Sequence, residues 1–463
     1  MTGSSGVSER RPQAGAAFAA YQSGKGTEAE AIGRAILAHD PRDAGAHYVC
    51  GLVAADRGAL DRARQAFEAA AALAPDKASL RITLGNLALR QGDDEAAEGA
   101  FRQALAQAPG SAAAHTNLGA ALKRQGRLEE AVECYRAGLA LYRGSAWWGA
   151  DPAAGAAVLD PAQRATFETA SRTKLEHDLA QLDYLLERGR LPPALAEGSA
   201  GRRRGLARLG REERPSTPRP LTEAERRLIG PIYNRVIYRP PEEAVAPALN
   251  PRLDGDAIER RYREAAPSVV VVDDFLSAPA LAALQRFCLE ATIWFDCKEH
   301  GGYLGAYLHE GFDHPVLIAL AREMGERLGG IVCGHRLAQM WAFSYGQAGG
   351  GTRKHADAAA ININLWLTPD SACPDPEAAG LVVHDVAAPP DWRFSDYNLD
   401  PARLDRLVAQ EGRAPVRVPY RCNRAVIFDS SLIHESGGVR FLDGYANRRI
   451  NVTLLFGERA EDG

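Results

Sequence analysis

The sequence predicts an α + β multidomain protein in which an all-α repeat solenoid precedes a mainly β domain. Small, aromatic and proline residues recur with a fixed period in the first third of the 463-residue chain. Short β-branched segments separated by turn residues are gathered after residue 266. At roughly 150 residues per domain, a chain of this length is expected to hold two or three domains.

The repeat has a period of 34 residues, which aligns three successive copies. The aligned sets are Pro41, Pro75 and Pro109; Gly51, Gly85 and Gly119; Ala63, Ala97 and Ala131; Phe67, Phe101 and Tyr135; and Ala70, Ala104 and Gly138. Small residues let two helices approach, the aromatic ring fills the gap between them, and proline ends the second helix. A weaker copy ends at Pro41 and has Gly33 at the aromatic position, although it keeps Ala17 and Ala29. This copy is expected to form an end cap.

A helical pattern follows the repeats from about residue 161 to 190. Its apolar positions are Leu175, Leu179, Leu182, Leu185 and Leu186. This spacing predicts a helix that covers the apolar face of the last repeat, and His177 on it is interpreted as structural. The next stretch, GSAGRRRGLARLGREERPSTPRP, has the composition of a solvated linker rather than of a phosphate-binding patch.

The C-terminal region alternates short strand patterns with turns. The strand segments are VVVVDDF, LAQMWAFSYG, ININLWLTP, GLVVHDV, NRAVIFDS and RRINVTLLFG. Ser277 is expected to cap a helix after the first of them, and a helical insertion is expected around DPARLDRLVAQEG. Many short strands in one region predict a sandwich or a barrel.

The amino-acid composition argues against some classes of binding partner. Lys and Arg total 55 against 59 Asp and Glu, a net charge of −4, which disfavours a general electrostatic grip on nucleic acid or on an anionic membrane. The sequence has no apolar segment of spanning length, and its seven cysteines form no CxxC pair. We therefore expect a soluble, cytoplasmic protein with reduced cysteines, and the oligomeric state stays open.

His355 and Asp357 stand two residues apart where the alternating segment ININLWLTP begins. On a strand, residues i and i+2 point to one face, so both side chains can reach one metal ion. A third ligand, His434, follows in the later segment AVIFDSSLIHESGG. Two imidazoles and one carboxylate suit Fe(II) with open positions, whereas zinc more often takes a fourth ligand or thiolates.

The segment ANRRINVTLLFG carries two arginines. An open Fe(II) site that activates oxygen needs electrons, and a bound organic acid can supply them if a guanidinium holds its far carboxylate through two parallel hydrogen bonds. Alternation places Arg449, Asn451 and Thr453 on one face, which is expected to point into the pocket. Arg448 falls on the opposite face, where a surface salt bridge is expected.

Two other segments are candidates for the pocket. Asn362 and Asn364 alternate with apolar residues, and we interpret them as pocket-lining because buried asparagines need partners; a solvated face is the alternative. The glycine-rich segment HGGYLGAYLHEGFDHP is interpreted as an ordered loop, or as one that closes over a substrate.

These motifs resemble two known families. SLRITLGNLALRQGDDEAAEGAFRQALAQAP and AAAHTNLGAALKRQGRLEEAVECYRAGLALY resemble tetratricopeptide repeats. The HxD motif, the later histidine of IFDSSLIHES and the segment RRINVTLLF together resemble Fe(II)- and 2-oxoglutarate-dependent oxygenases. More narrowly, VVDDFL, KHADAAAININLWLTPD, NRAVIFDSSLIHES and GYANRRINVTLLFG are similar to a bacterial group of tetratricopeptide-repeat proteins with a C-terminal oxygenase-like domain.

The resemblance implies a double-stranded β-helix, or jelly-roll, core with flanking helices. It implies Fe(II), 2-oxoglutarate as co-substrate, and dioxygen. The implied iron ligands and catalytic residues are His355, Asp357 and His434, and the implied co-substrate-binding residues are Arg449, Asn451, Tyr345 and Asn364. An added RFLDGY loop before the two arginines leaves open whether Arg448 or Arg449 is the anchor.

The resulting division of the chain is tetratricopeptide repeats at 1–145, a capping helix at 146–190, a linker and lead-in at 191–265, and an oxygenase-like jelly roll at 266–460. The expected function is a 2-oxoglutarate-dependent dioxygenase that hydroxylates a protein or peptide recruited by the repeat groove. A small-molecule or glycan-linked substrate, a cupin-like metal enzyme without 2-oxoglutarate, and a non-enzymatic scaffold with an inactive jelly roll are the alternatives.

Overall fold

The computed structural model divides into two compact units, Met1–Gly138 and Leu139–Gly463. The residues that it describes are 13–143, 169–191, 204–205, 207, 218–229, 233–242, 244–298, 302–332, 334–346, 348–349, 351–411 and 413–459. Within these ranges, every helix is too short or too polar to cross a bilayer.

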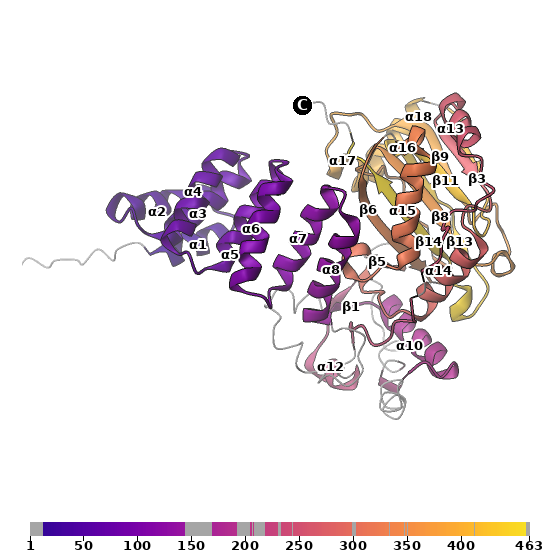
Figure 1. Ribbon diagram of the computed structural model, residues 1–463, viewed down its shortest axis with the longest axis horizontal. Helices are drawn as coiled ribbons and strands as arrows, with labels where there is room; N and C mark the ends of the chain where they lie inside the picture. Colours follow the sequence, from indigo (N-terminus) through magenta and orange to yellow (C-terminus); the bar gives the residue numbers. More distant parts are fainter. Residues whose placement is uncertain are drawn as a thin grey trace, which may run out of the picture. The chain divides into compact units, whose positions relative to one another are not determined.

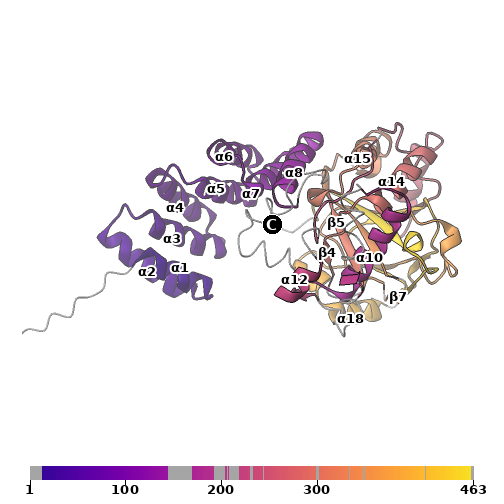
Figure 2. The same cartoon turned by 90° about the horizontal axis from the view of Figure 1, so that it is seen from below.

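The N-terminal region consists of eight consecutive helices, which Figure 1 and Figure 2 show as a succession of antiparallel pairs. They are α1 (Ala14–Gln22), α2 (Gly26–His39), α3 (Ala44–Asp56), α4 (Leu60–Leu73), α5 (Ala78–Arg90), α6 (Asp94–Gln107), α7 (Ala112–Arg124) and α8 (Leu128–Arg143). Side chains of Asp43, Asp93 and Ser111 cap α3, α6 and α7 by accepting from backbone N–H groups of the first turn.

The periodic residues of the sequence pack as their spacing predicts. In each repeat a glycine of the first helix lies against the aromatic ring of the second, in the pairs Gly51 with Phe67, Gly85 with Phe101, and Gly119 with Tyr135. A Cβ atom at any of these glycines would collide with the ring. The close approach of each helix pair therefore depends on the missing side chain. The weaker first copy also forms a helix pair, and its Gly33 lies against Cys50.

The segment after the repeats differs from its prediction. Thr169–Ala170 forms strand β1, which pairs with β2 (Arg219–Pro220), and helix α10 runs over Arg172–Glu187 with Ser171 as its N-cap. The expected helix is thus interrupted before Arg172, and its part at 161–168 lies outside the described residues. The apolar face of α10 packs in a cluster of the second unit that includes Tyr233, Ile237 and Tyr238. The predicted capping of the last repeat stays a prediction.

The second unit holds an antiparallel sheet region. Its largest sheet has seven strands in the order β3-β11-β8-β14-β6-β5-β4, and a three-stranded sheet has the order β10-β9-β12. The strands are β3 (Val269–Val272), β4 (Asp296–Cys297), β5 (Tyr303–Tyr307), β6 (Leu337–Tyr345), β8 (Ile361–Trp366), β9 (Leu381–Ala387), β10 (Val416–Val418), β11 (Ala425–Asp429), β12 (Leu432–Ser436) and β14 (Ile450–Phe456), with β7 (Ala348–Gly349) pairing to β13 (Val439–Arg440). The predicted β region is present, and its arrangement as a jelly roll stays a prediction.

Apolar side chains from both sheets meet in one core. Trp366, Val426 and Phe428 of the larger sheet pack with Leu381 and Val383 of the smaller sheet. Helices accompany the sheets: α12 (Glu223–Ile229), α13 (Gly255–Glu264), α14 (Ala278–Glu290), α15 (Pro315–Arg327), α16 (Gly329–Val332), α17 (Phe394–Asn398) and α18 (Pro401–Glu411). Ser277 caps α14 as predicted, and α14 lies beside α15 (Figure 1). Strand β8 is buried along its whole length, so it lies in the interior of the unit.

Candidate metal and anion site

The structure brings His355, Asp357 and His434 together through backbone pairing. His355 lies in the segment before β8 and exchanges two hydrogen bonds with His434 of β12, with N···O distances of 3.0 and 2.9 Å. The Asp357 N–H donates to the Ser430 carbonyl at 3.1 Å. His434 therefore lies within a separate short strand rather than at the end of the NRAVIFDS strand. This pairing sets the two imidazole centroids 4.2 Å apart.

The three side chains converge on one point. Each offers one ligand atom, and these atoms all lie within 4.8 Å of one another. Nε2 of His434 is 3.4 Å from Oδ2 of Asp357, and Nε2 of His355 is 3.9 Å from Oδ1. Among the residues that the structure describes, this is the one group of three or more His, Cys, Asp or Glu side chains with such a geometry.

Backbone carbonyls set the tautomer of both imidazoles. Nδ1 of His355 lies 2.7 Å from the Arg353 carbonyl, and Nδ1 of His434 lies 3.0 Å from the Leu432 carbonyl. A carbonyl only accepts, so each Nδ1 carries the proton and each Nε2 keeps its lone pair. Metal-binding histidines commonly have their second nitrogen held in this way. The donor set thus fits a divalent metal ion.

Electrostatics favours a neutral His355 and an ionised Asp357. Burial and the neighbouring His434 lower the pKa of His355. Burial raises the pKa of Asp357, but the two neighbouring imidazoles and the hydrogen bond that Asn362 donates outweigh this effect, so the pKa lies below its usual value. Neutral imidazoles and an ionised carboxylate are the forms that bind a metal.

Arg449 supplies a buried positive charge beside this group. Its side chain is 1% exposed, and Nε and Nη1 have no hydrogen-bond partner among the described residues. The guanidinium carbon lies 4.9 Å from the Tyr345 ring centroid and 5.9 Å from that of Trp366. A buried guanidinium without an anion is costly, so the site fits a ligand that brings a carboxylate.

A chain of amides connects the two ends of the site. Asn362 donates to Asp357 Oδ2 at 2.6 Å, Asn364 donates to Asn362 at 2.7 Å, and Asn451 donates to Asn364 at 2.9 Å. Oδ1 of Asn451 is buried without a partner in the described part of the chain. The asparagines of β8 are therefore buried and hydrogen-bonded rather than solvated.

All seven residues predicted for the site line one inner pocket. They are His355, Asp357, His434, Arg449, Asn451, Tyr345 and Asn364. Thr453 also lines this pocket, as the alternation predicts. Tyr345 is 1% exposed at the end of β6, and burial raises its pKa, so it stays a neutral phenol.

Arg448 is placed differently from its prediction. It was expected on the surface in a salt bridge, but it is buried 5.8 Å from the Tyr445 ring centroid and forms no ion pair with any described residue. It does not line the inner pocket, whereas Arg449 does. The reason is that helix α10 packs against the turn Tyr445–Asn447 that precedes Arg448, so this side of the chain is covered by protein.

A wider cavity of about 720 Å³ shares His355 and Asp357 with the inner pocket, and its aromatic wall was not predicted from the sequence. Trp341 and Phe343 line this cavity from β6. Their alternation in WAFSY was a readable signal of one lined face. The segment around Tyr303 and Tyr307, predicted as a loop, contains strand β5 and contributes both rings to the same cavity.

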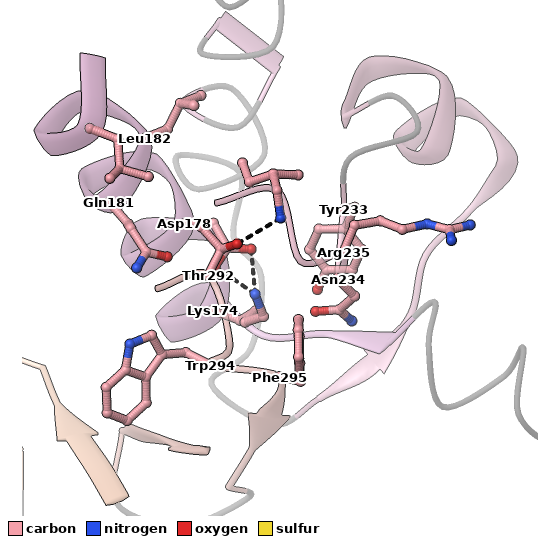
Figure 3. Close-up of a pocket in the computed structure, with 12 residues that line it drawn as sticks. Lys174, Asp178, Gln181, Leu182, Tyr233, Asn234, Arg235, Thr292, Trp294 and Phe295 are labelled. Carbon is pink, nitrogen blue, oxygen red and sulfur yellow. Dashed lines mark hydrogen bonds and ion pairs between the residues drawn. The ribbon is translucent and has the colours of Figure 1, made fainter. Parts of the chain in front are cut away.

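A separate pocket of about 40 Å³ under α10 is structural in character (Figure 3). Figure 3 shows Lys174 and Asp178 joined there as an ion pair. Gln181 donates to the Ala291 carbonyl at 3.0 Å. His177, predicted to be structural, is fully buried beside Trp294, and burial lowers its pKa to about 4.

Comparisons with known proteins concern the N-terminal region. The tetratricopeptide repeat family matches residues 15–78 and 82–146. Similar solved structures include MamA (23% identity, TM-score 0.26, covering 27% of this chain and 72% of that chain). They also include MamA 41-end from Desulfovibrio magneticus RS-1 (22%, 0.26, 27% and 71%) and YrrB, a TPR protein with an unusual peptide-binding site (21%, 0.26, 28% and 70%). No curated protein matches the chain. The N-terminal region carries tetratricopeptide repeats, which suggest a role in protein–protein interaction.

Proposed function

We propose that the second unit is an Fe(II)- and 2-oxoglutarate-dependent oxygenase that hydroxylates a protein or peptide recruited by the repeats. The observation that carries this proposal is the convergence of His355, Asp357 and His434 within 4.8 Å, in the same pocket as the buried guanidinium of Arg449, whose Nε and Nη1 have no hydrogen-bond partner in the described part of the chain. A metal-ligand set and a carboxylate anchor in one pocket are what such a reaction requires.

The ligand types favour iron. Two neutral imidazoles and one carboxylate leave several coordination positions open, which suits Fe(II) in oxygenases, and no thiolate lines the inner pocket among the described residues. When bound together, Fe(II) and 2-oxoglutarate would supply the electrons with which dioxygen converts a substrate C–H to C–OH, while 2-oxoglutarate becomes succinate and carbon dioxide.

The residues of the chain would position the co-substrate and the metal ligands and would limit the access of water. Arg449 would hold the far carboxylate through parallel hydrogen bonds, and the rings of Tyr345 and Trp366 limit the directions that its guanidinium can take. Asn362 would hold Asp357 on one oxygen. Tyr345 and Leu381, which belong to the core between the two sheets, line the pocket and would limit the access of water from that side. Two sheets packed face to face around this pocket also support a jelly-roll arrangement.

Anaerobic titration of the full chain with Fe(II) and 2-oxoglutarate tests the proposal. We expect the weak visible charge-transfer band of the iron–2-oxoglutarate chelate. The band is expected to be lost in Asp357→Ala and weakened in Arg449→Ala. Arg448→Ala removes a neighbouring buried arginine outside the pocket and serves as the control, with circular dichroism verifying that each variant is folded. A folded wild-type chain without the band would overturn the oxygenase proposal.

The second candidate function is a scaffold in which the second unit has no catalytic role. It is favoured by the tetratricopeptide match, since such repeats bind protein segments without chemistry of their own. In that case Fe(II) would bind loosely or not at all, and 2-oxoglutarate would not change its spectrum.

A further inference from the structure

The wider cavity is continuous with the candidate metal site. It has a volume of about 720 Å³, and its lining includes Thr352, His355 and Asp357, which also line the inner pocket. A molecule in this cavity therefore lies next to the open side of the metal ligands. The volume falls within the range of ligand-binding cavities in general.

One wall of the cavity is an aromatic surface built by two paired strands. In the register of β5 with β6, Tyr307 stands opposite Trp341. Tyr303 stands opposite Tyr345, two positions along the strands from Phe343 and therefore on the same face. Ring centroids are 4.9 Å apart for Tyr303 and Phe343, 5.9 Å for Trp341 and Phe343, and 6.2 Å for Tyr307 and Trp341. Such a wall holds a large apolar or aromatic group by contact area.

The mouth of the cavity exposes two large apolar side chains. Phe394 is 52% exposed and Leu399 is 67% exposed, and both line the cavity. A small molecule is buried inside its pocket and does not contact exposed side chains at the mouth. An exposed apolar rim is instead typical of a surface that contacts a macromolecule. The tetratricopeptide repeats of the same chain suggest protein partners and are consistent with a macromolecular ligand at this rim.

Positively charged side chains outnumber carboxylates in the lining of the cavity. Its cationic side chains, apart from the histidine, are Lys298, Arg353 and Lys354, and Asp357 is its carboxylate. Lys298 forms an ion pair with Asp296 at 2.6 Å, and Lys354 forms one with Asp405 at 2.7 Å. Arg353 is exposed and has no ion pair within the described part of the chain. Its charge is available to an acidic group.

We propose that this cavity binds an extended polypeptide segment that carries an aromatic or large aliphatic side chain beside an acidic residue. The apolar side chain lies on the wall of Trp341 and Phe343, and the carboxylate faces Arg353. This assignment rests on the proposed function, because it places the segment where the oxygenase would act. The binding itself needs no iron, so it can be measured separately.

Fluorescence anisotropy with three short labelled peptides of equal length tests the assignment. The first alternates Asp, Phe and Gly; the second has Lys for each Asp; the third has Ser for each Phe. We expect the first to bind the full chain at least about tenfold more tightly than the others at low salt. Arg353→Glu should abolish its advantage over the lysine peptide, and Leu399→Ser should reduce its advantage over the serine peptide. Arg322→Glu, an exposed arginine of α15 that does not line the cavity, should change neither.

The other results each overturn the assignment. Equal binding of the acidic and basic peptides, an advantage that survives Arg353→Glu and Leu399→Ser, or no binding of any peptide would exclude this ligand. The chelate band separates this failure from that of the proposed function. A band without peptide preference leaves the oxygenase with another substrate class, and peptide preference without a band leaves a docking groove with no oxygenase.

Discussion

Asn362 donates its side-chain amide to Oδ2 of Asp357 at 2.6 Å, and both side chains are buried. The candidate metal carboxylate is therefore held from a position five residues further along the chain, by the second residue of strand β8. Because Asn362 is itself held by Asn364, this arrangement limits the directions that the carboxylate can take.

Asn362→Leu should weaken metal binding, because it removes the donor while keeping a similar volume. Partners of metal ligands typically contribute about 10–100-fold in affinity. Titration with Co(II), followed by its visible absorption, measures this effect without catalysis. Thr453→Val, at the far end of the same polar chain and without contact to Asp357, is the control and should bind Co(II) as the wild type does. Equal affinities of Asn362→Leu and wild type would show that the amide does not position the carboxylate.

Arg449→Lys should weaken 2-oxoglutarate binding by about tenfold or more, because lysine keeps the charge but cannot make two parallel hydrogen bonds. Arg448→Lys should leave the affinity unchanged, since Arg448 lies outside the inner pocket. Titration of the chelate band at fixed Fe(II) gives both dissociation constants. The opposite ranking of the two variants would assign the anchor to Arg448.

Burial of His177 predicts a pH dependence of stability. Its pKa falls from an ordinary value of 6.5 to about 4 in the folded chain, so the unfolded chain takes up the proton first as the pH falls. The second unit should therefore lose about 2 kcal/mol between pH 7 and pH 5 from this group alone. Denaturant unfolding at both pH values should show a smaller loss for His177→Phe than for the wild type. Equal losses would mean that the buried imidazole takes up its proton without cost.

Replacing glycine by alanine should have opposite effects on the stability of the repeats at two positions, Gly85 and Gly99. Gly85→Ala places a Cβ against the Phe101 ring and should destabilise the repeats by about 1–3 kcal/mol. Gly99→Ala, at an exposed position of α6 where a Cβ would have nothing within 4 Å, should stabilise them by about 0.5–1 kcal/mol. Thermal unfolding followed by circular dichroism compares the two variants. A stabilising Gly85→Ala would contradict the packing of the repeat.

The repeats and most residues of the inner pocket could be predicted from the sequence alone. The period of 34 residues is readable because each repeat packs mainly with its neighbours, so its pattern is local. Alternation on β14 likewise placed Asn451 and Thr453 on one face, because side-chain direction in a strand depends only on position. The His-x-Asp spacing predicted that the two side chains lie close together, which they do, although both residues precede strand β8 rather than lying within a strand.

Features that depend on residues far apart in the chain became apparent only in the fold. In the fold, His355 pairs with His434, and Arg449 lines the inner pocket whereas Arg448 does not. Strands β5 and β6 pair to form one aromatic wall. The predicted helix is also interrupted before Arg172. These features follow from strand order and burial, and a local pattern of residues does not specify which distant segment will pair with it.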